Sequence, residues 1–176
     1  MAWHEILIRK LEEHSLLSKT DLSAIRKISG KMRNIAKGED ILRQGDKPVN
    51  SIVVVEGVLA RYHTITEGKR QYLSFHMAGD MPDAQTLFLE RMDHAVCAMN
   101  KAVIVQISHI ALLNLFEEKP TVGFAFWRET LIEAAIFREA ITNNSSRDLL
   151  TRMAHFFCEH YYRAKKNGLV KAHACD

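Results

Sequence analysis

The sequence predicts a mainly β domain with flanking helices, an α+β fold in which an antiparallel β-roll or jelly-roll precedes a long helix. Three observations predict it. Between Gly45 and Gly79, glycines recur every 11 or 12 residues and separate short β-branched segments. After Pro120 the apolar residues follow a helical period. The 176 residues are 47% hydrophobic and 26% charged, which suits about one domain and excludes disorder.

Two short amphipathic helices are expected within residues 1–30, at 6–11 and 22–28. Ser18 and Asp21 resemble a capping box at the start of the second helix, and Gly30 fits its end. The β-roll is expected over residues 31–119, with strands within 31–108. Strand-like segments occur at 51–56, 59–65, 70–75 and 101–107.

A dimerisation helix is expected over residues 120–143, because apolar positions recur there at steps of three and four, as in a coiled-coil seam. A helix that lies on its own barrel would show a similar stripe. Ala134 permits close approach of a second helix and favours a homodimer. The expected dimer-interface positions are Phe124, Trp127, Leu131, Ala134, Arg138 and Ile141.

A hinge is expected at Asn143, Asn144, Ser145 and Ser146, because such side chains compete with helical hydrogen bonds. A further helix should follow within residues 144–176 and end near Gly168. Its predicted apolar face is Leu149, Leu150, Met153, Phe157 and Tyr161. The net charge of +3 arises entirely from Arg147 onward, which indicates either nucleic-acid contact or a solvated helix face.

The order of these parts resembles the CRP/FNR family of bacterial transcription regulators. The segments 38–45, 53–58 and Gly79-Asp80 look like turn signatures of its cyclic-nucleotide-binding fold, and 147–157 resembles the helix that opens its winged helix-turn-helix domain. The resemblance implies a cytoplasmic homodimer that binds DNA through a domain absent from this chain. The chain is then expected to be truncated before that domain.

The resemblance also locates a phosphate-binding cassette. In cAMP-binding members a Gly-Glu pair holds the ribose and an Arg-Ser pair the cyclic phosphate; here Asp83-Ala84 and His94-Ala95 occupy those positions. The hydroxyl pair of the dimer helix that contacts the base falls on Phe137-Arg138. Between Gly79 and His94 the side chains sum to −3 with His neutral. We therefore expect no binding of cAMP or cGMP in the family's usual way.

The expected partners of the β-roll include an unknown small-molecule effector. Several aromatic side chains could line a cavity, or could simply fill the barrel. Arg138, at a seam position, would meet Glu133 or Glu139 of a partner helix, or a ligand carboxylate. The candidate effector-binding residues are Tyr62, Leu73, Asp83, Ala84, His94, Ala95, Phe137 and Arg138.

No cofactor, metal or enzymatic activity is expected. The cysteines, Cys97, Cys158 and Cys175, lack the close N-terminal spacing of an iron–sulfur site. A structural role is expected for His76 and His94 rather than haem binding, and for His155, Cys158 and Glu159 rather than zinc binding. Neither a His-x-His pair nor a nucleophile or nucleotide-loop motif occurs. The longest uncharged apolar run, 102–116, is too short to span a membrane.

Two functions follow as expectations from this sequence. The first is the effector-sensing and dimerisation region of a CRP/FNR-type DNA-binding regulator that does not respond to cAMP. The alternative is a constitutive dimerisation module whose barrel binds no effector. A pocket filled by its own side chains would favour the alternative.

Overall fold

A computed structural model describes residues 2–166 of the protein. The chain forms two compact units, Met1–Glu129 and Thr130–Asp176, with helix α4 running from one into the other. In chain order the elements are α1 (Trp3–Glu12), α2 (Lys19–Lys27), β1 (Lys31–Ile35), β2 (Asp40–Leu42), β3 (Asn50–Glu56), β4 (Leu59–Thr64), η1 (Thr66–Gly68), β5 (Arg70–His76), η2 (Ala84–Leu87), β6 (Ala95–Ala98), β7 (Ala102–Ser108), α3 (His109–Glu118), α4 (Pro120–Ser146) and α5 (Leu149–Lys166).

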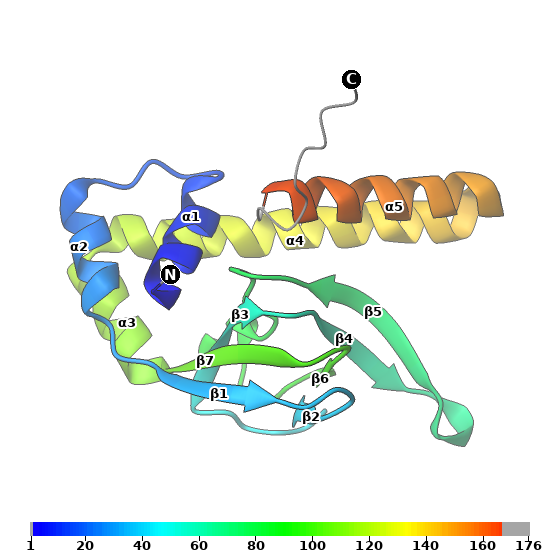
Figure 1. Ribbon diagram of the computed structural model, residues 1–176, viewed down its shortest axis with the longest axis horizontal. Coiled ribbons are helices and arrows are strands. Elements are labelled where there is room, and N and C mark those ends of the chain that lie inside the picture. Colours follow the sequence, from blue (N-terminus) through cyan, green and yellow to red (C-terminus); the bar gives the residue numbers. More distant parts are fainter. Residues whose placement is uncertain (1, 167–176) are drawn as a thin grey trace. The chain divides into compact units, whose positions relative to one another are not determined.

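The strands form two antiparallel sheets, ordered β1-β7-β3 and β2-β6-β4-β5 (Figure 1). This confirms the expected mainly β roll with flanking helices. Ile35, Ile52, Leu59 and Val96 belong to the apolar cluster shared by the two sheets. Because alternate residues of a strand point to opposite faces, this interior fixes which side chains of β4 and β6 face inward.

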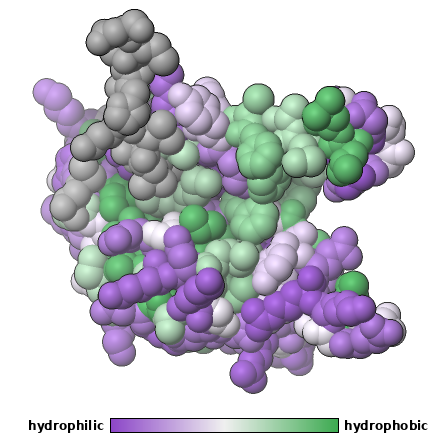
Figure 2. Space-filling view, turned by 45° about the vertical axis from the view of Figure 1, so that its right-hand side comes forward, coloured by the Kyte–Doolittle hydropathy of each residue, from purple (hydrophilic) through white to green (hydrophobic). Residues whose placement is uncertain are grey.

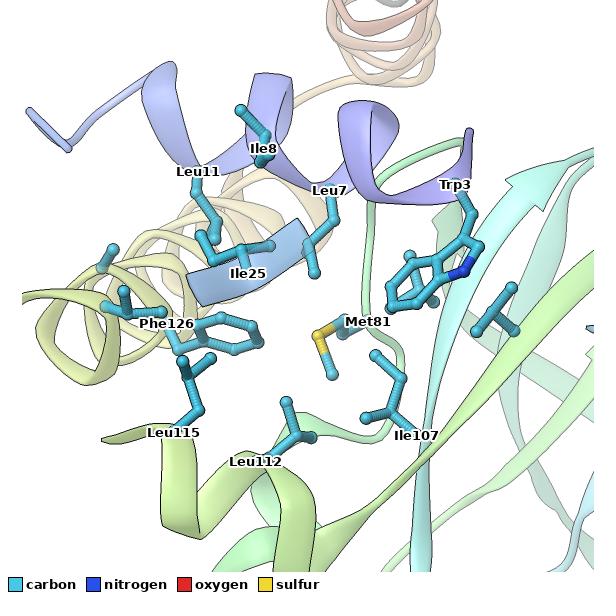
Figure 3. Close-up of a cluster of buried hydrophobic side chains, with 14 residues drawn as sticks. Trp3, Leu7, Ile8, Leu11, Ile25, Met81, Ile107, Leu112, Leu115 and Phe126 are labelled. Atoms are coloured by element: carbon cyan, nitrogen blue, oxygen red, sulfur yellow. The ribbon is translucent and has the colours of Figure 1, made fainter. Parts of the chain in front are cut away.

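A second core lies where the helices meet the first sheet (Figure 3). Leu7 and Leu11 of α1 pack with Leu115 of α3 and Phe126 of α4. Met81, from the loop after β5, enters the same cluster. Full burial of one such side chain contributes about 1.5–3 kcal/mol, so this core holds the loop against the helices.

Two glycines are required by close approach at turns. Gly57, between β3 and β4, has φ 87°, and a Cβ there would lie 2.7 Å from the Lys101 carbonyl oxygen. Gly79 has φ 93°, and its Cβ would lie 2.8 Å from Cβ of Lys10 on α1. Both positions combine left-handed backbone with crowding, so only glycine fits without strain.

The expected N-terminal helices and their capping box are confirmed. Ser18 Oγ accepts from the Asp21 backbone N–H at 3.2 Å, and an Asp21 carboxylate oxygen accepts from the Ser18 N–H at 2.9 Å. The expected region 31–119 contains the seven strands, but it ends in a helix, α3, that the sequence analysis did not separate from it. Strands β1, β2 and β6 were not identified individually either.

The second helical segment differs in its boundaries from the expectation. α4 continues through the proposed hinge to Ser146, whose hydroxyl donates to the Thr142 carbonyl at 2.7 Å. The break falls at Arg147 and Asp148, and a carboxylate oxygen of Asp148 accepts from the Thr151 N–H at 3.0 Å, capping α5. The expected helix end at Gly168 and the cysteine at 175 lie outside the described residues.

Candidate functional site

The loop between β5 and β6 corresponds to the cassette expected from the sequence. It begins at a turn in which an Asp80 carboxylate oxygen accepts from the Met77 N–H at 2.8 Å. Asp83 is fully buried, and its Oδ1 accepts from the Ile52 N–H of β3 at 2.9 Å. Its carbonyl also accepts from the Thr86 hydroxyl at 2.7 Å. Asp83 therefore ties the loop to the roll and is not an open position for a ligand.

Arg61 of β4 enters this cassette from the roll interior. Its side chain is 4% exposed, and its Nε donates to the Pro82 carbonyl oxygen at 2.7 Å. His94 Nε2 lies 3.2 Å from the same carbonyl and 3.4 Å from Nε2 of Gln85, while its Nδ1 lies 2.9 Å from an Asp93 carboxylate oxygen. The expected charge of −3 counted only residues 79–94, so it omitted this buried guanidinium.

The environment of His94 keeps its imidazole neutral. Burial, followed by the positive charge of Arg61, lowers the pKa of His94 below its ordinary value, although Asp93 acts in the opposite direction. A second cation at this place is therefore disfavoured. The cassette holds one buried guanidinium bonded to its own loop and a neutral imidazole beside it.

Two other candidate effector residues face a different pocket. Tyr62 follows Arg61 in β4 and therefore points to the opposite face of the sheet. Its hydroxyl donates to Asp40 Oδ1 at 2.8 Å. Tyr62 and Ala95 line a pocket of about 340 Å³ together with residues of β2 and the turn after it. The candidate effector residues, expected to form one site, are thus divided between the cassette and this pocket.

Of the remaining candidates, Ala84 belongs to the cassette loop, Leu73 lies on β5, and Phe137 and Arg138 lie on α4. Leu73 is the extra residue of a β-bulge, between the pairs Arg61↔Ser74 and Tyr62↔Tyr72, and is about one-third exposed. Ala84 begins η2 and offers no acceptor for a ribose hydroxyl. Phe137 and Arg138 lie on α4 in the second unit.

Helix α4 exposes the apolar positions expected at a dimer seam. Phe124, Trp127, Leu131 and Ile141 are each at least half exposed. Arg138 is also exposed, and Ala134 is half-buried. Exposure of large apolar side chains at coiled-coil spacing is typical of a helix that packs against another protein surface.

Helix α5 carries a further exposed apolar face. Figure 2 shows hydrophobic residues gathered at the centre and upper right of the drawn face. Within the second unit, Glu139 of α4 bonds Arg147 at 2.7 Å and lies 3.9 Å from Nε2 of His155 on α5. The predicted apolar residues Leu149, Leu150, Met153, Phe157 and Tyr161 are all exposed.

Within residues 2–166, no group of three or more His, Cys, Asp or Glu side chains is arranged to hold a metal ion. None of the helices in that range is long and apolar enough to span a membrane.

Sequence reasoning missed Arg61, Asp40 and Arg70 as members of polar clusters. One signal was present for Arg61: an arginine stands between Ala60 and Tyr62 in a segment that otherwise reads as a buried strand. A charge at such a position calls for a partner. Asp40 and Arg70 come from separated strands and carried no comparable signal.

Known proteins are similar to this chain in sequence. The family model of the cyclic nucleotide-binding domain matches residues 32–119, half of the chain. The fumarate and nitrate reduction regulatory protein of Vibrio cholerae is 21% identical over 152 residues, 86% of this chain and 61% of its own length. Electron transport regulator A of Shewanella oneidensis is 26% identical over 141 residues, 80% of this chain and 56% of its own length.

Solved structures agree on the fold. FixK2 from Bradyrhizobium japonicum has a TM-score of 0.70 at 20% identity, covering 77% of this chain and 68% of its own. A cyclic nucleotide-binding domain from Methylobacillus flagellatus also has a TM-score of 0.70, at 13% identity, covering 84% and 86% of the two chains.

The chain therefore belongs to the cyclic nucleotide-binding domain family, and the resemblance to the CRP/FNR regulators is confirmed. It spans about three-fifths of the length of the curated relatives it matches. Both of these relatives are named as regulators.

Proposed function

We propose that this chain is the sensor and dimerisation region of a CRP/FNR-type transcription regulator that does not respond to cAMP or cGMP. Two copies associate through the seam of α4, and the state of the β-roll alters how the two helices meet. DNA binding belongs to a domain outside this chain. Such a mechanism requires two global states with different affinity for an effector.

The buried Arg61 guanidinium is the observation that carries the cAMP part of the proposal. It already donates to Pro82, so a phosphodiester would have to compete with the cassette's own carbonyl. His94, at the position of the family's phosphate-binding arginine, is held neutral. Ala84, at the position of the ribose-binding glutamate, has no polar side chain.

Isothermal titration calorimetry tests this part directly. We expect no saturable heat for cAMP or cGMP, because the Arg61 guanidinium already bonds Pro82, the pKa of His94 is lowered, and Ala84 has no side-chain acceptor for a ribose hydroxyl. A micromolar dissociation constant for either nucleotide would contradict the proposal. A cAMP-binding relative, measured in the same buffer, provides the positive control.

The second candidate is a constitutive dimerisation module. The internal bonds of the cassette favour it, because the buried side chains of Asp83 and Arg61 already bond the backbone at Ile52 and Pro82. The pocket beside Tyr62 favours the sensor, because it is open and its volume suits a metabolite.

A further inference from the structure

We propose that the pocket between β2, β4 and the start of β6 binds a small hydroxylated organic anion. This pocket is separate from the nucleotide cassette. Its lining residues are Asp40, Arg43, Gln44, Tyr62, Thr64 and Ala95. At about 340 Å³ it has the size of a small-metabolite site.

The inner wall of the pocket is a preorganised polar network. The Asp40 carboxylate accepts from the Tyr62 hydroxyl at 2.8 Å and from Arg70 Nη2 at 3.0 and 3.1 Å. The Arg70 guanidinium also lies 4.4 Å from the centre of the Tyr62 ring. Burial, reinforced by the bond to Asp40, raises the pKa of Tyr62 to about 12. Tyr62 is thus a permanent donor, and the Asp40 charge is balanced by Arg70.

The outer wall has polar groups without protein partners. Within residues 2–166, the side chains of Arg43, Gln44 and Thr64 make no hydrogen bond or ion pair, although the backbone around them is well bonded. One cation, one amide and one hydroxyl therefore face the same space. With Asp40 neutralised by Arg70, the remaining charge of the lining is that of Arg43.

This combination selects a ligand class. A guanidinium pairs with a carboxylate or a phosphate by charge-assisted hydrogen bonds. Amide and hydroxyl side chains bond the hydroxyl groups of a ligand. Ala95 and the Tyr62 ring supply an apolar floor for its carbon chain. Hydroxy acids and sugar phosphates share these features.

The pocket is linked to the cassette through backbone hydrogen bonds. The turn that carries Arg43 and Gln44 bonds the end of the cassette loop, since the Gly45 N–H donates to the Met92 carbonyl at 2.8 Å and the Met92 N–H to the Asp46 carbonyl at 2.9 Å. Arg91 also donates to the Gly45 carbonyl at 3.1 Å. A ligand that fixes this turn would fix the cassette as well. That the pocket is an effector site rests on the proposed regulator function. That it binds a small anion does not depend on that function.

Amide chemical shifts of the isotopically labelled chain test the site. The probes are gluconate, glycerate and 3-phosphoglycerate at millimolar concentration, with glycerol as the neutral comparison. We expect saturable shifts at the amides of Gln44, Thr64 and Ala95 with at least one anion. Arg43→Gln should weaken that binding at least about tenfold, because it removes a charge-assisted contact. Thr64→Val should weaken it severalfold.

Lys37→Gln is the matched control, because it removes one exposed positive charge outside the pocket. It should leave the affinity unchanged. Three results would overturn the site: no shift at these amides with any of the anions, equal binding of glycerol, or unchanged affinity in Arg43→Gln. If the chain sediments as a monomer and still binds an anion in this way, the proposed dimeric regulator is contradicted and the proposed anion site is supported.

Discussion

At the residue scale, consecutive side chains of β4 serve different sites. Arg61 points into the roll and bonds the cassette, while Tyr62 points outward and bonds Asp40. The alternation follows from the pleat of a strand, in which neighbours face opposite ways. A buried arginine is tolerated because its donors are used, and a buried donor or acceptor left unmatched is expensive.

Removing the Arg61 donors should destabilise the fold. In Arg61→Met the apolar length is kept, but the buried Pro82 carbonyl loses the 2.7 Å hydrogen bond from Arg61. We expect the free energy of unfolding to fall by about 1–3 kcal/mol, measured by urea denaturation. Arg33→Met, which removes an exposed pair with Glu39, should change it by less than about 1 kcal/mol. Equal stability of Arg61→Met and the parent would show that the buried bond contributes nothing.

His94 should make stability depend on pH. Its pKa is lowered in the folded state, whereas in the unfolded chain it lies near about 6.5. The unfolded chain therefore binds more protons between these two values, and stability is complete above about pH 6.5 and is lost as pH falls below it. His94→Gln, which keeps a donor for Pro82, should lose less stability than the parent between about pH 7 and pH 5.

Urea denaturation of both proteins at each pH provides the comparison. Contributions from other groups, such as His109, whose pKa burial also lowers, are present in both proteins and cancel in the difference. Parallel stability curves for the parent and His94→Gln would refute the role of His94.

At the scale of elements, α4 shows that Asn and Ser side chains do not have to end a helix. Asn and Ser favour helix ends, yet residues 143–146 remain helical. Ser145 and Ser146 donate to carbonyls four residues earlier, at 2.8 and 2.7 Å, and Asn143 accepts from Arg147. Side chains that bond back onto the helix satisfy themselves without ending it.

Association through the seam of α4 can be tested by introducing one charged side chain. Leu131→Asp should dissociate the proposed dimer, because two carboxylates would face each other where apolar contact is required. Analytical ultracentrifugation should show that the dissociation constant of the dimer rises at least about tenfold. Asn144→Asp adds the same charge at a position that flanks the seam and should weaken association less than Leu131→Asp. A Leu131→Asp protein that associates like the parent would exclude this seam.

At the scale of the whole molecule, two exposed apolar surfaces remain on the described chain, the seam of α4 and the face of α5. Large exposed apolar patches are uncommon on monomers and usually mark interaction sites. The first suits a second copy of the chain, since its positions repeat at coiled-coil spacing.

The whole chain should therefore sediment at twice its monomer mass at tens of micromolar protein. Because apolar burial drives this association, moderate salt should weaken it little. A sedimentation series in protein and salt concentration measures both properties. A monomer throughout the series would contradict self-association of this region.

The sequence by itself determined the mainly β class with flanking helices, strands β3, β4, β5 and β7, the capping box at Ser18 and the glycine turns of the roll. These depend on local periodicity and on backbone conformations that few residues adopt. It also carried the family resemblance, which depends on the spacing of the same turns.

Only the tertiary structure decided the composition of the two sites. Arg61 and Pro82 are 21 residues apart, and Asp40 and Arg70 are 30 apart. Local periodicity tells which residues share a face of a strand, but it does not tell which loop will cover that face. Contacts between segments that are distant in the sequence determine which loop covers each face. Arg61 therefore lies in the cassette, whereas Tyr62 and Ala95 line the other pocket.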